Sequence, residues 1–388
     1  MRDANCLAEA GYDVTVITPS FVERWVKYDQ EIIKSVKWKY IYLDFINNPI
    51  SRIYWNYVKT RHRLSKILAS WLLTEQIVAN ACEYVNRELF MLAAKNEADI
   101  YISHQQQSLP AAVWAAQKVK SKFAIDIHDL LSDCSSEPIH LIKNIEERYL
   151  KRCAYVSTMS SVAAQRLKEV NKLSKIPIVR HNTPKIQERE GILSPEQRSS
   201  SDIISIYWFG QTIGYHSRAD QVIRAMPLLC KPVKLVLRGN PNNEFVGSLY
   251  ALAQKLDVAQ YLEIKPISSP NKMVKLAAEH DIALGTQPGK ELFHQMAIGN
   301  KVFTGMMAGL CLALTDTIAH RQLMREAPGC GFLFPDEDEY ILAERLNELL
   351  NNYERIQKMK STSWHLAEER FNSEKEVQIL LDTLLYLT

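Results

Sequence analysis

Short apolar runs alternate with helical patterns along the first half of the chain. An opening segment with apolar residues at helical spacing ends at Gly11, and an apolar run follows it directly. Similar runs return further on, separated by segments of helical periodicity. We expect strands at 13–18, 98–103, 123–127, 155–157 and 177–179, and helices at 110–119 and 142–153. Strands that alternate with helices predict a mostly parallel sheet with helices on both faces.

This alternation is interrupted once and then starts again. Residues 185–202 are polar and charged and contain Pro195 and three consecutive serines, which is the composition of a linker. Beyond the interruption we expect strands at 203–209, 234–239, 282–285 and 310–314, helices at 220–229 and 303–308, and a helical tail from 338. The first of these strands is expected to end at Gly210. The pattern predicts an α/β protein of two doubly wound, Rossmann-like domains, 1–184 and 203–365, joined by the linker 185–202.

The opening of the first domain departs from this pattern. A doubly wound domain normally begins with a strand and a glycine-bearing turn, whereas this chain begins inside a helical pattern. We therefore expect the first, central strand of the N-terminal sheet to be missing from the sequence. Either the true start lies upstream, which we favour, or the domain is built without that strand.

Length and composition fit a globular protein and exclude several classes. A chain of 388 residues is long enough for about two domains. The net charge of +3 is too small to indicate a nucleic-acid partner. The seven cysteines are scattered without a Cys-x-x-Cys pair, so they indicate free thiols in a reducing compartment and no zinc site. No apolar run reaches the roughly 18 residues of a membrane span, and we expect a cytoplasmic protein.

A basic and aromatic stretch lies near the N-terminus. Between Phe21 and Glu75 there are ten Lys or Arg and five Asp or Glu, together with four tryptophans. Residues 21–71 could lie against the anionic inner face of a membrane, beside a lipid-linked acceptor. More often, such residues form helices with one side in the core and the other in water. Both readings stay open.

Several segments resemble one known family in their order and spacing. They are 207–219, 234–239, 281–285, 300–310 and 330–336, and 7–17 fits the same family's N-terminal domain. Together they resemble the retaining, group 1 type (family 4) of nucleotide-sugar glycosyltransferase, which has the GT-B fold. The resemblance implies a nucleotide-sugar-binding second domain, an acceptor-side first domain, and a C-terminal helix at 366–388 that crosses back to the first domain.

The family's donor is a sugar joined to a nucleoside diphosphate, and the leaving diphosphate gains negative charge during transfer. Without a metal, this charge must be met by fixed cations and backbone N–H groups. The resemblance assigns Arg218 and Lys301 as the cations, with Asn300 beside Lys301 at a helix N-terminus and Gly210 where the backbone approaches the phosphate. The alternatives are a solvated Arg218, a Lys301 that only extends its stem along the helix end, and a Gly210 that only forms a turn.

Two positions depart from the family pattern. Met296 and Thr304 stand where much of the family has glutamates, and the second glutamate normally holds the ribose hydroxyls of the donor. Thr304 offers a single hydroxyl, so we expect weaker ribose binding. Gln211 stands where many relatives have a second phosphate-binding arginine, and Glu291 is a candidate substitute for the missing carboxylate.

In the first half, residues 125–130 resemble the family's strand-end motif that carries a histidine. By that resemblance His128 is the catalytic-site residue that faces the transferred sugar, and His104 ends an earlier strand in a similar way. The alternative is that His128 stabilises its loop by bonding to Asp126 or Asp129.

We therefore predict a retaining, metal-independent hexosyltransferase that moves a sugar from a nucleotide donor, UDP-sugar by default, to a glycan or lipid-linked acceptor. No cofactor, metal or nucleic acid is expected. The main alternative is a non-catalytic relative that keeps the GT-B fold as a binding or assembly subunit, which Met296, Thr304 and the absent strand favour. A nucleotide-sugar epimerase is a third reading. The base, sugar, acceptor and oligomeric state stay open.

Overall fold

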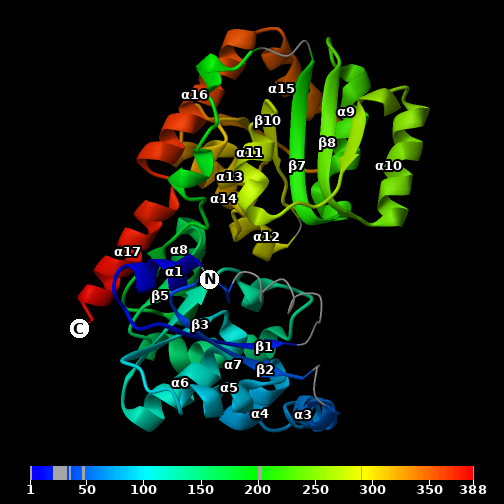
Figure 1. Ribbon diagram of the computed structural model, residues 1–388. Helices are drawn as coiled ribbons and strands as arrows, with labels where there is room; N and C mark the ends of the chain where they lie inside the picture. The colour runs from blue at the N-terminus through cyan, green and yellow to red at the C-terminus, as the bar shows by residue number, and fades with distance from the viewer. Residues whose placement is uncertain are drawn as a thin grey trace. The chain divides into compact units, whose positions relative to one another are not determined.

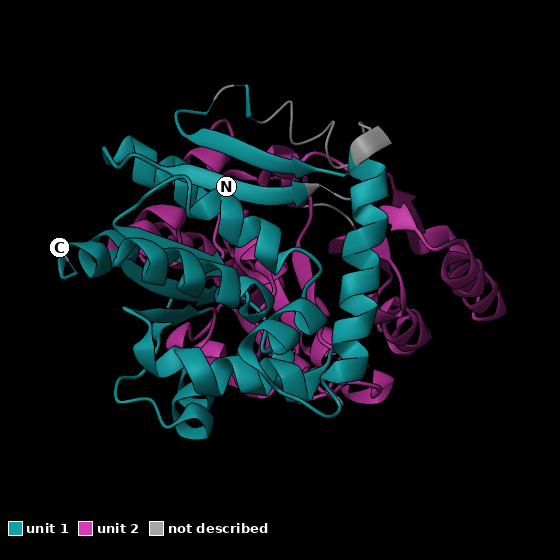
Figure 2. Cartoon of the chain, turned by 90° about the horizontal axis from the view of Figure 1, so that it is seen from below, with its two compact units in different colours: residues 1–158, 164–179, 379–388 teal, residues 159–163, 180–378 magenta. Residues whose placement is uncertain are grey.

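The chain forms two compact α/β units in the computed structural model (Figure 1), which describes residues 2–20, 33–34, 36–45, 49–199, 203–289 and 291–387. Unit 1 comprises residues 1–158, 164–179 and 379–388, and unit 2 comprises residues 159–163 and 180–378 (Figure 2). The sheets of both units are parallel. The predicted fold class, two doubly wound α/β domains, is confirmed.

Unit 2 contains a six-stranded sheet in the order β12-β11-β10-β7-β8-β9. Its strands are β7 (Ile204–Ile213), β8 (Val233–Pro241), β9 (Leu262–Lys265), β10 (Ile282–Gly285), β11 (Cys311–Thr315) and β12 (Gly331–Phe334). The chain moves outward from β7 to β9 on one side, then returns to the centre and moves outward from β10 to β12. The strand order therefore reverses between β7 and β10, and ligands of doubly wound sheets bind at the carboxyl ends of such strands.

Helices cover both faces of this sheet. They are α9 (Ala219–Ala225), α10 (Asn243–Lys255), α11 (Met273–Ala277), α12 (Leu292–Met296), α13 (Asn300–Met307), α14 (Ile318–Glu326), α15 (Glu339–Leu350) and α16 (Tyr353–Glu369). Alternate residues of β7 point to opposite faces. Ile206 and Trp208 join a core cluster with residues of α9, α10 and α15, whereas Tyr207 joins a second cluster with residues of α11, α13 and α14. The central strand is thus buried from both sides.

Helix α13 packs closely on the sheet because it carries a glycine at the contact. A Cβ on Gly305 would lie 2.5 Å from the Cβ of Ala283 on β10. The helix ends at Met307, and Gly309, two residues further on, has a φ of 67° that reverses the chain into β11. The predicted succession of helix and strand at 303–314 is therefore confirmed, although the helix begins three residues earlier.

Unit 1 contains two separate parallel sheets. One pairs β1 (Thr15–Ser20) with β2 (Lys39–Asp44), and the other has the order β3-β4-β5-β6, formed by Ile100–His104, Lys122–Ile127, Val156–Thr158 and Ile178–Val179. No strand pairing joins the two sheets within the described ranges. The helices are α1 (Arg2–Glu9), α3 (Pro49–Leu68), α4 (Glu75–Cys82), α5 (Asn86–Ala93), α6 (Leu109–Val119), α7 (Ile139–Tyr149) and α8 (Ser161–Asn171).

The last helix, α17 (Ser373–Leu385), begins in unit 2, and its final turns belong to unit 1. Leu380 and Leu384 pack there in a cluster with Leu7, Ala124 and Tyr155. The C-terminal helix thus returns to the N-terminal unit, as the resemblance implied.

Two segments differ from the sequence-based expectation. Strand β7 does not end at Gly210: after a register irregularity, it continues its pairing with β8 through Ile213. The polar interval expected as a linker, 185–202, belongs to unit 2 and packs within it as far as it is described. The guanidinium of Arg189 lies 3.8 Å from the centre of the Trp364 ring, and its Nε donates to the carbonyl of Met307. Cation–π contact and a buried hydrogen bond hold this segment in place.

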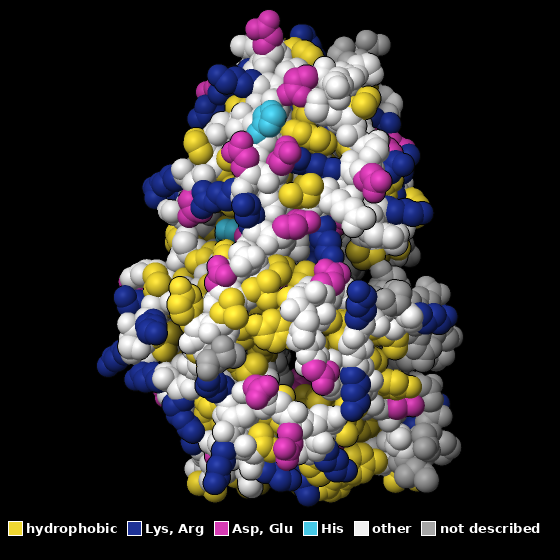
Figure 3. Space-filling model, turned by 60° about the vertical axis from the view of Figure 1, so that its left-hand side comes forward, with side chains coloured by type: hydrophobic (Ala, Val, Ile, Leu, Met, Phe, Trp, Pro, Cys, Tyr) yellow, Lys and Arg dark blue, Asp and Glu magenta, His cyan; other side chains and the backbone are white. Residues whose placement is uncertain are grey.

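Basic and acidic side chains are interspersed on the face shown in Figure 3, in keeping with the small net charge. Among the described helices, none is long and apolar enough to cross a membrane. Much of the basic stretch predicted near the N-terminus, including 21–32, lies outside the described residues.

Candidate functional site

Lys301 lies in the first turn of α13, near the carboxyl ends of β7 and β10. Its ammonium nitrogen is 5.3 Å from the centre of the Trp208 ring, within the range of a cation–π contact. Burial lowers the pKa of Lys301 below its ordinary value. No carboxylate within the described ranges forms an ion pair with it. Lys301 is therefore a largely desolvated cation whose counter-charge the described part of the chain does not supply.

The start of α13 adds backbone donors to this cation. Gly299 is the residue that caps the helix, and it has no side chain that could accept from the first N–H groups. Asn300 follows as the first helical residue and is exposed. The helix dipole gives this end a partial positive charge. An anion placed here would meet N–H groups, the helix dipole and Lys301 together.

A buried hydrogen-bond chain fixes the indole beneath Lys301. The Nε1–H of Trp208 donates to the hydroxyl of Thr286 (3.2 Å), which in turn donates to the carbonyl of His216 (3.0 Å). Burial and the nearby charge of Lys301 lower the pKa of His216. Residues from β7, from the loop after β10 and from the loop after β7 thus meet at this point. Sequence reasoning missed Trp208, Thr286 and His216; only their places near the ends of predicted strands could have indicated them.

Gly210 makes room for the same indole. A Cβ at this position would lie 2.5 Å from the Trp208 ring, so a larger residue would displace it. Because β7 runs on to Ile213, Gly210 is a strand residue, and the expectation that it forms the turn after the strand is wrong. Its contact with a donor phosphate stays a prediction.

Arg218 lies in the loop that leads from β7 into α9, with a positive φ of 51°. Its guanidinium is paired with the carboxylate of Asp336: Nε lies 2.6 Å from Oδ1 and Nη2 donates to Oδ2 at 2.8 Å. Asp336 also accepts the backbone N–H of Gly289 at 2.8 Å. An anion bound by Arg218 would share the guanidinium with Asp336. Asp336 lies in the segment 330–336 that resembles the family, but the sequence analysis did not predict that it pairs with Arg218.

Two predicted positions are turned toward the protein interior. Thr304 is buried, and its hydroxyl donates to the carbonyl of Asn300 in its own helix at 3.0 Å. Met296 is buried, and its backbone carbonyl accepts from the hydroxyl of Ser160. Among the described residues, Thr304 has no second hydrogen bond that would orient it outward. The contact of Thr304 with a ribose therefore stays a prediction, and the inward hydrogen bond of its hydroxyl does not favour it.

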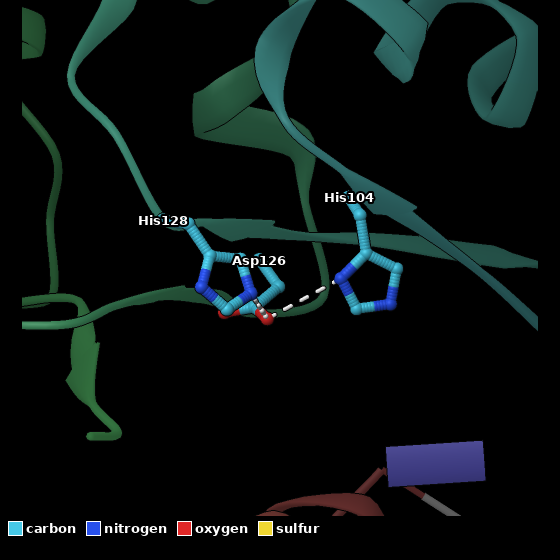
Figure 4. A group of neighbouring side chains, drawn as sticks. All are labelled: His104, Asp126 and His128. Atoms are coloured by element: carbon cyan, nitrogen blue, oxygen red, sulfur yellow. Dashed lines mark ion pairs between the residues drawn. The ribbon is translucent and has the colours of Figure 1, made fainter. Parts of the chain in front are cut away.

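The predicted catalytic residue, His128, belongs to unit 1 and follows β4. Its Nε2 lies 2.9 Å from Oδ2 of Asp126, and Nδ1 of His104, at the end of β3, lies 3.4 Å from the same oxygen (Figure 4). The hydroxyl of Ser157 donates to the other oxygen, Oδ1, at 2.7 Å. The bond between His128 and Asp126 that the alternative reading anticipated is present. His128 and His104 are brought together around one carboxylate.

Charge interactions in this group favour ionised side chains. Burial alone would raise the pKa of Asp126, but hydrogen bonds from His104 and His128 outweigh it and hold this pKa well below its usual range. The hydrogen bond to Asp126 raises the pKa of His128, against the effect of burial, and the negative charges of Asp129 and Asp3 add to the rise. The surroundings of His128 thus favour positive charge.

A depression of about 480 Å³ lies over α16 and is lined partly by Lys358, Thr362 and His365. None of the predicted site residues lines this depression. We assign no function to it.

A scan against protein-family sequence models matched none, and a search of curated proteins found no match. Solved structures do match. A glycosyltransferase from Rickettsia africae aligns with a TM-score of 0.70 at 12% identity, covering 98% of this chain and 92% of that one. The Anabaena protein HepE, solved with UDP-glucose, aligns with a TM-score of 0.70 at 13% identity, covering 99% and 94%. Sucrose-phosphate synthase from Thermosynechococcus elongatus aligns with a TM-score of 0.67 at 12% identity, covering 100% and 92%.

These matches extend over nearly the whole of both chains, at identities of 12–13%. Likeness at such low identity establishes architecture and leaves the activity to be argued from the site. The parallel sheets, the returning C-terminal helix and the structural matches agree. The chain therefore has the GT-B fold of two Rossmann-like units that these glycosyltransferases share.

Proposed function

We propose that the protein is a glycosyltransferase that takes a sugar from a nucleoside diphosphate donor. The observation that carries this proposal is Lys301: a desolvated cation at the open N-terminus of α13, without a carboxylate partner among the described residues. A diphosphate would supply the missing counter-charge and accept hydrogen bonds from the backbone N–H groups at the start of α13. The position beside the strand-order reversal of unit 2 supports a nucleotide as the ligand.

In this proposal Lys301 and the N–H groups at Asn300 stabilise the charge that grows on the leaving diphosphate. Arg218 contributes after it exchanges part of its pairing with Asp336 for the phosphate. Transfer proceeds without a metal and with retention, and UDP is the default nucleotide. Structures of HepE contain UDP-glucose and UDP, which supports the choice of UDP as the first nucleotide to test. His128 stays our candidate for the residue that contacts the transferred sugar.

We further propose that the acceptor side involves a lipid surface, through α3. Apolar residues recur along one side of this helix and are exposed: Ile53, Tyr57, Leu64, Ile67 and, just beyond the helix end, Trp71, which is 87% exposed. The opposite side packs inward through Val58 and Ala69. Residues 49–71 contain five Lys or Arg and no Asp or Glu. Arg61 is paired with Glu88, and the other charged neighbours of the apolar stripe are all basic. Such a stripe suits an anionic membrane that carries a lipid-linked or glycan acceptor.

A second candidate function follows from Thr304 and Met296. Both are buried, and neither offers the carboxylate that the resembling family uses. A protein with this arrangement could keep diphosphate binding through Lys301 and yet not transfer the sugar. It would then act as a nucleotide-sugar-binding subunit of an assembly.

One experiment separates these functions. The protein is first titrated with uridine, UMP, UDP and a panel of UDP-sugars. For each UDP-sugar that binds, the release of UDP is then measured. This second measurement is made with and without vesicles of anionic lipid and glycan acceptors. UDP binding with nucleotide release supports the transferase. UDP binding without release under any condition supports the binding subunit. Absence of nucleotide binding overturns both.

A further inference from the structure

Two histidines and one aspartate in unit 1 have the composition and spacing of a transition-metal site. His104 Nδ1, Asp126 Oδ2 and His128 Nε2 all lie within 4.8 Å of one another. They come from the ends of the adjacent parallel strands β3 and β4, whose pairing is in register at His104 and Asp126. Two imidazoles with one carboxylate are a frequent ligand set for zinc and for non-haem iron. Within the described ranges, no other group of this kind exists.

The distances fit a small divalent ion. Zinc bonds of about 2.0–2.1 Å in a tetrahedral site place the ligand atoms about 3.3 Å apart. Oδ2 of Asp126 lies 2.9 Å from Nε2 of His128 and 3.4 Å from Nδ1 of His104. The two imidazole rings are stacked at an angle of 30° with their centres 6.1 Å apart. Small side-chain rotations would therefore bring the three atoms around one ion.

The site has an oriented buried ligand and an open side. Asp126 is buried, and Ser157 donates to its second oxygen, which aims Oδ2 at the histidines (Figure 4). Hydrogen bonds of this kind orient the ligands of natural metal sites. The side chains of His104 and His128 are 54% and 38% exposed, so a metal can enter and keep a water as its fourth ligand.

We propose that His104, Asp126 and His128 form a binding site for one divalent transition-metal ion of the zinc class. The bound ion closes the ends of β3 and β4 together and occupies Nε2 of His128. This site does not depend on the proposed glycosyltransferase activity, since it requires only unit 1. It shares His128 with the proposed sugar contact, so a bound ion would compete with sugar transfer, which we expect to need no metal.

The test is a zinc titration of the full chain by calorimetry, in a Cys230→Ser background that removes an exposed thiol. We expect one zinc per chain, at least tenfold weaker binding in His104→Ala, and about 10- to 100-fold weaker binding in Ser157→Ala. His140→Ala is the matched control, since His140 is an exposed histidine of the same unit, and its binding should equal that of the parent. His104 is more than half exposed, so its loss should leave the fold intact, which circular dichroism verifies.

Cobalt substitution identifies the ligands directly. With nitrogen and oxygen ligands alone, the cobalt complex should show the absorption of a four- or five-coordinate ion without a thiolate charge-transfer band, and His104→Ala should abolish it. A thiolate band would place the metal on a cysteine and overturn the proposal. Equal zinc affinity in His104→Ala, or no zinc binding by the parent, would overturn it as well.

Discussion

At the scale of single residues, the environment of a side chain decides what its charge can do. Lys360 is buried and Lys301 is partly buried, and their settings differ. Lys360 donates to the carboxylate of Asp281 at 2.8 Å, so its charge is balanced within the fold. Lys301 faces an indole and has no such partner within the described ranges. The first lysine is structural, and the second is available to an anion.

A buried histidine should make the folded state sensitive to acid. His320 is fully buried, its Nδ1–H donates to the carbonyl of Thr315 at 2.8 Å, and burial lowers its pKa from about 6.5 to about 4. The unfolded chain therefore takes up a proton near pH 6.5, while the folded chain does not until about pH 4. Stability is retained above pH 6.5 and falls as the pH is lowered toward 4, by up to about 3 kcal/mol from this residue.

His320→Gln keeps an N–H for Thr315 but does not titrate. We expect the loss of unfolding free energy between pH 7 and pH 4.5 to be smaller in this variant, measured by urea unfolding at each pH. Some acid sensitivity should remain, because burial also lowers the pKa of His280 to about 4. The exposed His140→Gln is the control and should follow the parent. Parallel pH profiles for His320→Gln and the parent would contradict this explanation.

At the scale of elements, α13 is positioned by its glycine. Gly305→Ala places a methyl group 2.5 Å from Ala283, and neither backbone can yield easily. We expect a loss of about 1–3 kcal/mol in unfolding free energy and weaker UDP binding, because the start of α13 would move with the helix. Thermal melting and UDP titration measure the two effects.

Gly247→Ala is the matched control for this substitution. Gly247 lies inside α10, and a Cβ there would meet nothing within 4 Å. The substitution should therefore raise stability by up to about 1 kcal/mol through helix propensity. If Gly305→Ala melted at or above the parent temperature, close packing of α13 would not be what positions Lys301.

The elements also show what periodicity could and could not predict. Buried parallel strands such as β10 and β11 are nearly continuous apolar runs, so their places followed from the sequence. The extension of β7 past Gly210 did not, since it depends on pairing with β8 across an irregular register. In the candidate site, the family resemblance did indicate Lys301 and His128. The pairing of Arg218 with Asp336 joins positions 118 residues apart and needed the tertiary structure.

At the scale of the whole molecule, α17 belongs to both units, because it begins in unit 2 and ends in unit 1. Its final turns complete the core of unit 1, where Leu380 is almost fully buried. Leu380→Ala should remove about 2–5 kcal/mol of packing from that core. In hydrogen exchange, the amides of β4 should lose more protection than those of β11 in unit 2.

Leu385→Ala is the control within the same helix, because Leu385 is 64% exposed. Its exchange pattern should match that of the parent. Equal loss of protection in β4 and β11 of the Leu380 variant would contradict the assignment of these turns to unit 1.

The central claim is that Lys301 and the start of α13 hold a diphosphate, and calorimetric titration of Lys301→Met with UDP, UMP and uridine tests it most directly. Met keeps the apolar stem over Trp208 and removes the charge, and Lys255→Met, at the exposed end of α10, is the control. The parent and the control should bind UDP more tightly than UMP and uridine. In Lys301→Met, UDP binding should weaken about 10- to 100-fold while uridine binding is unchanged. Equal UDP affinity in Lys301→Met and the parent would contradict the claim.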